Sequence, residues 1–462
     1  GDDLMIENDA FKLLLINLFH LNPDDIANIV CTTFNKMMVL VVTLADKHQA
    51  CPYCGFTAPK IKEYVTKEIT HSALTTQKCI IKYRARRYKC SCCGKTYYEF
   101  NPFVFKSQKI SILTVHNILK DLKDFNETFT SVARRYHVSP TSVSTIFDNH
   151  VDIGRNPLPE IINFDEVYAF KSEKSKYVCV LLDFKKQIPV DVLPNRKKEY
   201  LLNYFQKIPL EERKKVKYAC SDMYEVYRDV VHKVFPESKH LLDYFHLSQD
   251  FHKKMNEVRI KVMKGYKDNK ASDEYYLLKK FNWLLFKNPE DEDKYGRLFD
   301  VERERKYNSH FKSYMNYYDL RKKILEINND LTICYSLKLE LVDFYSKSTI
   351  DNAKVNLENL IRSCIDTNIE EMIKFSNNLI NWKQEIINSF TIVGTEYKVE
   401  ADKGQVVVCN KKVNNAIIEN RNKIIKCIKN NANGYTNWSR FRNRVMYVLD
   451  SNATFSLEPR EK

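Results

Sequence analysis

The order of strands and helices between residues 157 and 250 limits the folds open to this chain more than any other stretch. Short apolar runs after Pro157 and Pro159 predict strands at 161–168, 177–184 and 188–193. Helical patterns at 197–207 and 224–235 then alternate with strand patterns at 215–222 and 240–245. Three strands joined as a meander and followed by alternating helices and strands indicate a ribonuclease-H-like α/β sheet, in which the first and fourth strands are neighbours.

Acidic side chains occupy the first and fourth of these strands. Asp165 lies within an otherwise apolar run, where an unpaired carboxylate is costly, so a salt bridge or a metal ion is expected beside it. Asp222 follows 57 residues later and would meet Asp165 at one end of the sheet. Two carboxylates held together repel unless a cation lies between them, and hard divalent ions prefer such oxygen ligands. Glu166 points to the other face of the sheet, and Asp183 is a further strand-end candidate.

Two cysteine knuckles mark the first 105 residues. Each is a Cys-x-x-Cys pair followed by glycine, and together the four thiolates match the tetrahedral ligand set of structural zinc: Cys51, Cys54, Cys90 and Cys93. Because no segment resembles a secretion signal, the 13 cysteines should be reduced, which favours metal binding over disulfides. Cys92 is an alternative to Cys93, but only Cys93 keeps the two-residue gap and the following glycine.

The stretch 78–89, between the knuckles, alternates basic residues with apolar or aromatic ones, as a strand with one cationic face would. Either it is an edge strand protected by its charge, or Arg86 and Arg87 contact DNA phosphates. The net charge of +15 and the pI near 9.0 favour a polyanionic partner, with nucleic acid as the first candidate.

Residues 128–147 predict two short helices around a tight turn, the pattern of a helix-turn-helix. Ser139 or Thr141 would cap the second helix, which would bury Val143, Ile146 and Phe147. The side chains expected to contact DNA are Arg134 and Arg135 on the first helix and, exposed toward base edges on the second, Thr141, Ser142, Ser144 and Thr145. A helical hairpin with no DNA role is the alternative.

The segment 251–404 predicts an all-helical insertion, because its apolar residues recur at helical spacing. Trp283 and Trp382 are expected in its core, although one of them could instead stack on an unpaired base. Apolar surface on this segment could also serve dimerisation.

Residues 414–426 predict an amphipathic helix. Ile417, Ile424 and Ile428 lie together on one side, and Glu419 projects from the opposite side near Asn415 and Asn422. On this pattern alone, Glu419 is an ordinary surface acid.

Four stretches resemble the catalytic core of the ISL-three (ISL3) family of bacterial insertion-sequence transposases: 165–166, 190–196, 221–224 and 243–246. The knuckles, the helix-turn-helix and the core follow one another in that family's order, and the resemblance covers nearly the whole chain. The family's activity is DDE transposition, in which three acids hold two magnesium ions for the cleavage and joining of transposon ends.

The resemblance also implies individual site residues. The helix around Glu419 resembles the family's Glu-centred helix, so Glu419 would complete a catalytic triad in which Asp165 bridges two Mg²⁺ (or Mn²⁺) ions while Asp222 and Glu419 each hold one. Glu396 and Glu400 are rivals for the third position. Asp243 and His246 resemble an accessory pair. Residues 432–442 resemble the family's basic and aromatic segment, and further DNA contacts are expected from Lys423, Lys426, Arg440 and Arg442.

These features predict a multidomain α+β protein with a zinc-binding domain at 1–105, a helix-turn-helix domain at 106–156, a ribonuclease-H-like catalytic domain at 157–250 and 405–450, and a helical insertion at 251–404. The expected function is a DNA transposase that binds the terminal inverted repeats of an insertion sequence and catalyses cleavage and strand transfer. The alternatives are a structure-specific DNA nuclease and a DNA-binding regulator with an inactive core. We expect a homodimer on double-stranded DNA in the bacterial cytoplasm, associated with the nucleoid and not with a membrane.

Overall fold

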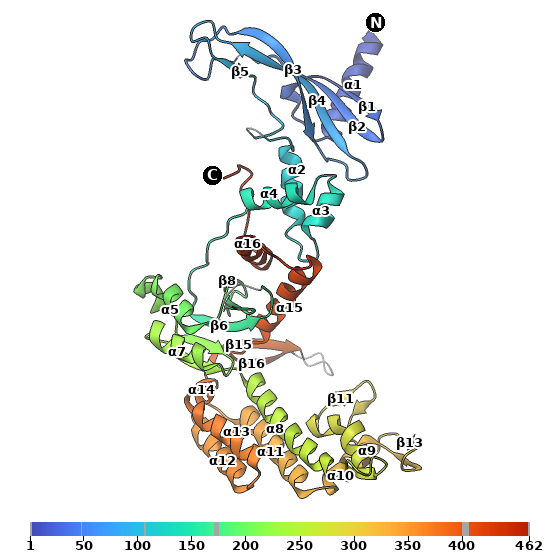
Figure 1. Ribbon diagram of the computed structural model, residues 1–462, viewed down its shortest axis with the longest axis vertical. Helices are drawn as coiled ribbons and strands as arrows, with labels where there is room; N and C mark the ends of the chain where they lie inside the picture. The colour runs from blue at the N-terminus through green and yellow to red at the C-terminus, as the bar shows by residue number, and fades with distance from the viewer. Residues whose placement is uncertain (1, 48, 106–107, 171–174, 400–405, 461–462) are drawn as a thin grey trace.

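The computed structural model describes residues 2–47, 49–105, 108–170, 175–399 and 406–460. The molecule is elongated (Figure 1): an N-terminal sheet lies at one end, a bundle of helices lies at the other, and a second sheet lies between them. Among the described helices, none combines the length and the apolar character needed to cross a bilayer.

The N-terminal unit is a five-stranded sheet packed against one helix. Its elements are α1 (Asp2–Leu18), the 3-10 helix η1 (Pro23–Asp25), β1 (Ile26–Phe34), β2 (Met37–Leu44), β3 (Lys60–Thr70), β4 (Cys79–Lys89) and β5 (Thr96–Tyr98). The strand order is β1-β2-β4-β3, with β5 also paired to β4. The strand predicted at 78–89 is therefore β4, in the interior of the sheet, and the interpretation of it as an edge strand is wrong. Its apolar positions are buried as the alternation predicts, because Ile81, Tyr83 and Ala85 face the core.

Three helices follow: α2 (Ile112–Asp121), α3 (Phe129–Arg135) and α4 (Pro140–His150). The two helices expected within 128–147 are present, and α4 buries Val143, Ile146 and Phe147. Of the two candidate caps, Ser139 is the one that accepts the backbone N–H of Ser142.

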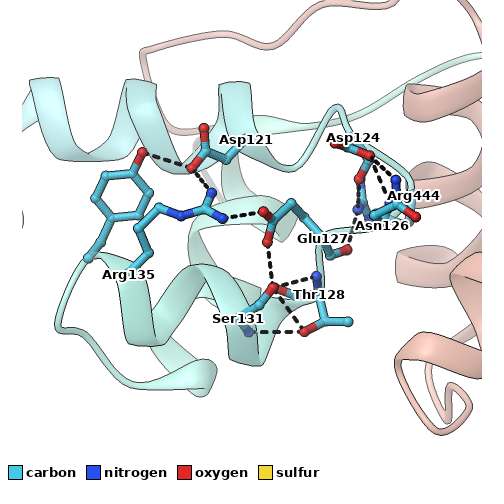
Figure 2. A network of polar contacts seen from close by, with 9 residues as sticks. Asp121, Asp124, Asn126, Glu127, Thr128, Ser131, Arg135 and Arg444 are labelled. Atoms are coloured by element: carbon cyan, nitrogen blue, oxygen red, sulfur yellow. Dashed lines mark hydrogen bonds and ion pairs between the residues drawn. The ribbon is translucent and has the colours of Figure 1, made fainter. Parts of the chain in front are cut away.

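The near-C-terminal helix α16 (Trp438–Leu449) ties these three helices to the rest of the molecule. Tyr447 packs in their core, and the buried Arg444 donates to the carbonyl oxygens of Asp124 at 2.9 Å and Glu127 at 2.7 Å. Figure 2 shows Arg444 reaching this loop from α16, while the Glu127 carboxylate accepts from Ser131 and from the guanidinium of Arg135. Residues more than 300 positions apart thus form one packed unit.

The central sheet contains the strands predicted around Asp165. They are β6 (Ile161–Val167), β7 (Val178–Asp183), β8 (Pro189–Leu193), β9 (Tyr218–Ser221) and β10 (Lys239–Leu242), connected in part by α5 (Lys198–Gln206), α6 (Leu210–Arg213) and α7 (Glu225–Val234). The strand order is β10-β9-β6-β7-β8. Strands β6, β7 and β8 are antiparallel, whereas β9 and β10 run parallel to β6 and β9, which confirms the predicted contact between the first and fourth strands. Helices α5 and α7 cover one face, and α15 (Ala416–Asn431) and α16 cover the other.

The segment after β10 is mainly helical and has its own large core. Its helices are α8 (Tyr244–Lys264), α9 (Asp273–Lys280), the 3-10 helix η2 (Asn282–Phe286), α10 (Tyr317–Glu326), α11 (Asn329–Lys347), α12 (Ala353–Asp366), α13 (Glu370–Asn381) and α14 (Lys383–Asn388). Trp382 is buried and Trp283 packs against this core, as predicted for packing residues.

The prediction of an all-helical insertion is wrong at three places. Two short hairpins interrupt the helices, β11 (Glu292–Asp293) with β12 (Gly296–Arg297) and β13 (Lys306–Asn308) with β14 (Ser313–Met315). A longer hairpin of β15 (Ile392–Val399) and β16 (Val406–Lys412) ends the segment. In the first hairpin Gly296 has a φ of +97°, a conformation that suits a tight turn and not a helix. The β-branched residues of β15 and β16 favour strands.

Candidate active site

Three aspartates stand side by side at one end of the central sheet. The parallel register of β6 and β9, continued by two residues, places Asp165 beside Asp222. The register of β9 and β10 in turn places Asp243 beside Asp222, and the Asp243 amide donates to the Ser221 carbonyl at 3.0 Å. Residues in register on parallel strands point to the same face, so the three carboxylates share one face near the carboxyl ends of the strands.

Helix α15 brings Glu419 to these aspartates. Asn415, Glu419 and Asn422 are spaced at about one turn of helix and form one polar stripe. Asn422 Nδ2 donates to Asp165 Oδ2 at 2.7 Å, and the backbone N–H of Asn415 donates to Asp243 Oδ1 at 3.3 Å. Glu419 lies on the stripe between these two contacts. The polar stripe therefore faces the carboxylates of the sheet, and the reading of Glu419 as an ordinary surface acid is wrong.

The apolar side of α15 also differs from the prediction. The buried apolar residues are Ile418, Ile425 and Ile428, whereas Ile417 and Ile424 are only partly buried. The helix is covered over a wider arc than the expected stripe, because it packs against both β6 and α16.

The pair Asp243 and His246 belongs to the same site. Asp243 precedes the first residue of α8, and His246 Nε2 lies 3.8 Å from Asp243 Oδ2. Asp243, His246 and Glu419 each offer one ligand atom within 4.8 Å of the others. The predicted accessory pair is thus placed next to the predicted third acid.

Burial raises the pKa values of the three aspartates, and repulsion by neighbouring carboxylates adds to the rise at Asp165 and Asp243. Desolvation is the largest cause at Asp165, and with the neighbouring Asp222 carboxylate it raises the pKa of Asp165 to about 7. Desolvation likewise raises the pKa values of Asp222 and Asp243, and the His246 imidazole opposes the rise at both. Such a cluster binds protons or cations more readily than separate surface carboxylates do.

The residues fit a divalent metal site. Asp222 Oδ1, Asp243 Oδ2 and His246 Nε2 are buried atoms with no hydrogen-bond partner in the described part of the chain. Buried polar atoms are normally paired. Buried carboxylate oxygens left without donors match the ligands that Mg²⁺ and Mn²⁺ prefer.

The other acids considered from the sequence have structural roles. Glu166 lies on the opposite face of the sheet, where it pairs with Arg196 and accepts from Tyr227 Oη. Asp183 Oδ1 accepts the backbone N–H groups of Lys185 and Lys186 at 2.9 and 3.0 Å and so stabilises the turn after β7. The side chain of Glu396, and Glu400 altogether, lie outside the described residues.

The four predicted zinc ligands come together at the edge of the N-terminal sheet. Cys51 Sγ lies 3.7 Å from Cys93 Sγ, and Cys54 Sγ lies 3.5 Å from Cys90 Sγ. All four sulfur atoms lie within 4.8 Å of one another, and Cys92 is not part of this group. The glycine after each knuckle has a positive φ, +75° and +71°, which lets the chain turn tightly around the sulfurs. The set suits a tetrahedral zinc ion.

Five of the predicted DNA-contacting arginines are paired within the protein. Their partners are Glu99 for Arg86, Glu63 for Arg87, Glu127 and Asp121 for Arg135, Asp148 for Arg440 and Asp191 for Arg442. These ion pairs link each arginine to a neighbouring strand, helix or loop, so the guanidinium groups stabilise the fold.

The remaining predicted DNA contacts differ in exposure. Arg134, Thr141, Thr145, Lys423 and Lys426 are exposed, and Ser142 is half-buried. Ser144 was expected to be exposed, but it is 8% exposed and its hydroxyl donates to the Thr141 carbonyl at 3.0 Å. A serine within a helix commonly makes this local bond, which here turns the hydroxyl away from solvent.

Sequence reasoning missed the asparagines that hold the site. Asn163 Nδ2 donates to Asn415 Oδ1 at 2.7 Å and to the Asn414 carbonyl at 2.8 Å, which fixes the start of α15 on β6. Asn422 holds Asp165 as described above. The spacing of Asn415, Glu419 and Asn422 was visible in the sequence, but nothing in it showed that this stripe would face inward.

Comparisons with known proteins agree on one family. A family model described as "Transposase", for the ISL3 group of DDE type, matches residues 162–401. The chain is also 18% identical, over 409 residues, to a transposase for insertion sequence element IS1001 from Bordetella parapertussis, a match that covers 88% of this chain and 90% of that protein. The matched range of the family model includes Asp165, Asp222, Asp243 and His246.

Proposed function

This chain belongs to the ISL3 family of DDE transposases, and from that membership we propose that it binds the terminal inverted repeats of an insertion sequence and catalyses metal-dependent cleavage and strand transfer. Membership of a transposase family implies DNA as the partner and divalent metal ions as cofactors. The observation that supports the proposed chemistry best is the convergence of Asp165, Asp222, Asp243 and Glu419 from four separate segments on one face of a sheet.

We propose that the central sheet is a ribonuclease-H-like catalytic core formed by 157–250 and 405–450. The strand order β10-β9-β6-β7-β8, with three antiparallel strands followed by two parallel ones, supports this assignment. On this assignment the segment 251–404 is an insertion between the last core strand and the helix that carries Glu419, and 1–105 and 106–156 are DNA-recognition domains, the second of which shares its core with α16.

We propose that Asp165, Asp222 and Glu419 hold the catalytic metal ions, with Asp243 and His246 completing the site. Bound divalent ions would lower the pKa of the attacking hydroxyl and stabilise the leaving oxygen. Asp165 is held on both oxygens, since Oδ1 accepts the Glu166 amide at 2.8 Å and Oδ2 accepts Asn422. The chain thereby fixes the direction of this carboxylate before DNA binds, so little reorganisation is left for the reaction itself.

We propose that DNA lies along the exposed cations of α3 and α15 and the exposed threonines of α4, Thr141 and Thr145. Arg134 lines a hollow of about 470 Å³ between the start of α3 and residues 431–437, which supports a shared DNA surface for the two segments. Lys423 and Lys426 are exposed on α15, the helix that carries Glu419. Contacts of this kind grip phosphates and position the substrate. Joining two DNA ends also calls for two copies of the chain, so we propose a homodimer on DNA.

A strand-transfer assay with Asp165→Asn tests the proposed chemistry. The substrate is a duplex that carries the terminal repeat found beside the gene, incubated with Mg²⁺ and a plasmid target. We expect loss of both cleavage and joining by roughly a thousandfold or more, because the amide cannot serve as an anionic ligand. Asp183→Asn is the matched control, since this acid lies on the neighbouring strand and only caps a turn through Oδ1, an atom that asparagine retains.

Each outcome of the assay decides between functions. Strand transfer at the wild-type rate by Asp165→Asn would overturn the assignment of the catalytic acids. Cleavage without joining by the wild-type protein would show a nuclease instead of a transposase. Binding without any cleavage would show a DNA-binding regulator.

A further inference from the structure

A second group of metal-binding side chains lies on the face of the central sheet opposite to the aspartates. His232 on α7, His240 on β10 and Glu385 on α14 each offer one ligand atom within 4.8 Å of the others. His240 and Glu385 are buried, with exposures of 1% and 5%, whereas His232 is exposed. The group joins the sheet to the last helix of the helical segment.

Hydrogen bonds fix the state of the His240 ring. The Ser221 hydroxyl donates to the Asp222 carbonyl at 2.9 Å, so its oxygen accepts from His240 Nε2, which also lies at 2.9 Å. With its proton on Nε2, the ring has a bare lone pair on Nδ1. This Nδ1 atom is buried and has no partner among the described residues. Burial also lowers the pKa of His240 to about 3, which keeps the ring neutral.

This arrangement is the one that metal-ligating histidines adopt. A histidine ligand commonly donates its other N–H to an oxygen of the protein, and that bond sets the tautomer and the direction of the ring. Here the Ser221 oxygen takes that role for Nε2, which leaves Nδ1 as the nitrogen of His240 available to a metal shared with His232 and Glu385. A buried imidazole nitrogen without a partner would otherwise cost free energy.

Glu385 has a similarly incomplete environment. Its carboxylate makes no hydrogen bond within the described chain, and His232 Nε2 lies 3.9 Å from its Oε1 atom. This separation is longer than a hydrogen bond. A buried carboxylate without a hydrogen-bond donor favours binding of a cation.

We propose that His232, His240 and Glu385 bind a zinc ion that fastens α14 to the central sheet. Two imidazole nitrogens and one carboxylate suit zinc, whereas Mg²⁺ and Ca²⁺ prefer oxygen ligands alone. Zinc bonds of ~2.1 Å in a tetrahedron bring ligand atoms to roughly 3.4 Å apart. Because the side chain of His232 is exposed, it can move to bring its nitrogen that close to the other two ligand atoms. Water would take the fourth position.

The site would couple the helical segment to the catalytic face. The Ser221 hydroxyl joins His240 to the carbonyl of Asp222, whose carboxylate lies on the other face. Asn388 of α14 also donates to the His240 carbonyl at 2.9 Å, so α14 already contacts this strand without metal. Zinc at this position would hold β10 and α14 together directly behind the proposed catalytic acids.

Metal titration of the full-length protein tests the proposal. The probes are Zn²⁺, with bound metal counted by mass spectrometry after removal of free ion, and Co²⁺, whose thiolate charge-transfer bands separate cysteine ligands from nitrogen and oxygen ligands. In the presence of excess Mg²⁺, we expect each chain to bind two equivalents of Zn²⁺ or Co²⁺. With Co²⁺, one equivalent should show thiolate charge-transfer bands from the four cysteines, and the other should not. His232→Ala and Glu385→Gln should each lose the second equivalent, whereas Lys233→Ala, an exposed neighbour on α7, should keep it.

One further variant separates this site from the catalytic acids. In Asp165→Asn the second equivalent should remain, because the two sites lie on opposite faces of the sheet. Saturation of the wild type at one thiolate-bound equivalent would overturn the proposal. The proposal would also be overturned if both His232→Ala and Glu385→Gln kept the second equivalent of metal. The same holds if Asp165→Asn were the one variant to lose it. None of these readouts depends on transposition.

Discussion

The cysteine cluster and the acid cluster differ in how the chain builds them. The cysteines lie on two tight turns within 43 residues of sequence, at the edge of one small sheet. The acids come from β6, the ends of β9 and β10, and α15, and 254 residues separate Asp165 from Glu419. Among the described residues, the cysteines share a small core with Tyr88 and Tyr97, whereas large cores lie on both faces of the sheet that carries the aspartates.

This difference assigns metal ions two opposite roles. The zinc ion would be the main link between the two knuckles, so metal binding and local folding are coupled there. Without magnesium, the central sheet and α15 still hold the carboxylates close together. The free energy of folding must then offset the repulsion between these carboxylates. The metal should therefore maintain structure at the first cluster and only relieve repulsion at the second.

The largest effect that this comparison predicts is loss of the knuckles on removal of one zinc ligand. Cys54→Ser should reduce the zinc bound by the four cysteines from one equivalent to none, because serine is a poor zinc ligand. Proteolysis at residues 49–58 and 90–96 should accelerate roughly a hundredfold, since the local structure opens without metal. Zinc content and limited proteolysis measure both changes.

Cys92→Ser is the matched control for that variant. Cys92 is exposed and lies one residue from the ligand Cys93, outside the cluster. It should bind zinc and resist protease as the wild type does. If the knuckles of Cys54→Ser stayed protected from protease, zinc would not be needed for their structure, and the proposed difference between the two clusters would be wrong.

The sequence predicted those parts of the molecule that depend on local spacing. The two Cys-x-x-Cys-Gly motifs identified all four clustered cysteines, and the strand order placed Asp165 beside Asp222. Strand pairing is non-local, yet it was predictable here because the alternation of helices and strands leaves few right-handed connections.

The parts that could not be predicted depend on which side of an element faces inward. The stripe of Asn415, Glu419 and Asn422 is polar, and a polar stripe is normally solvated. It faces inward because Asn163 and Asp165 on β6 offer matching polar groups. Arg135 and Arg440 likewise read as DNA contacts, although their carboxylate partners lie elsewhere in the chain.

A second effect concerns the pH dependence of stability at the acid cluster. The pKa of Asp165 rises from 3.8 to about 7, so between these values the folded state binds more protons than the unfolded state. Stability is therefore lost as pH rises from about 4 to about 7, by on the order of 4 kcal/mol for this group in magnesium-free buffer. Hydrogen exchange in β6 and α15 at pH 5 and pH 8, corrected for intrinsic rates, measures the change.

Asp165→Asn and added Mg²⁺ serve as the two controls. The variant should lose most of the difference between pH 5 and pH 8, because its amide does not titrate. Mg²⁺ should protect the wild type more at pH 8 than at pH 5, and it should protect the variant little. An equal pH dependence in wild type and Asp165→Asn would mean that the cluster stores no repulsion, and the two clusters would then not differ as described.

The smallest effect tests whether Asn422 orients the Asp165 carboxylate for metal binding. Asn422→Asp removes the amide that donates to Asp165 Oδ2 and places another carboxylate there. Groups that orient metal ligands typically contribute 10- to 100-fold to affinity or activity, so strand transfer should fall by about that factor and require more Mg²⁺. The dependence of the rate on Mg²⁺ concentration measures both. Asn420→Asp, an exposed position on the same helix, adds the same charge away from the cluster and should change neither. Equal losses in the two variants would assign the effect to DNA repulsion instead of ligand orientation.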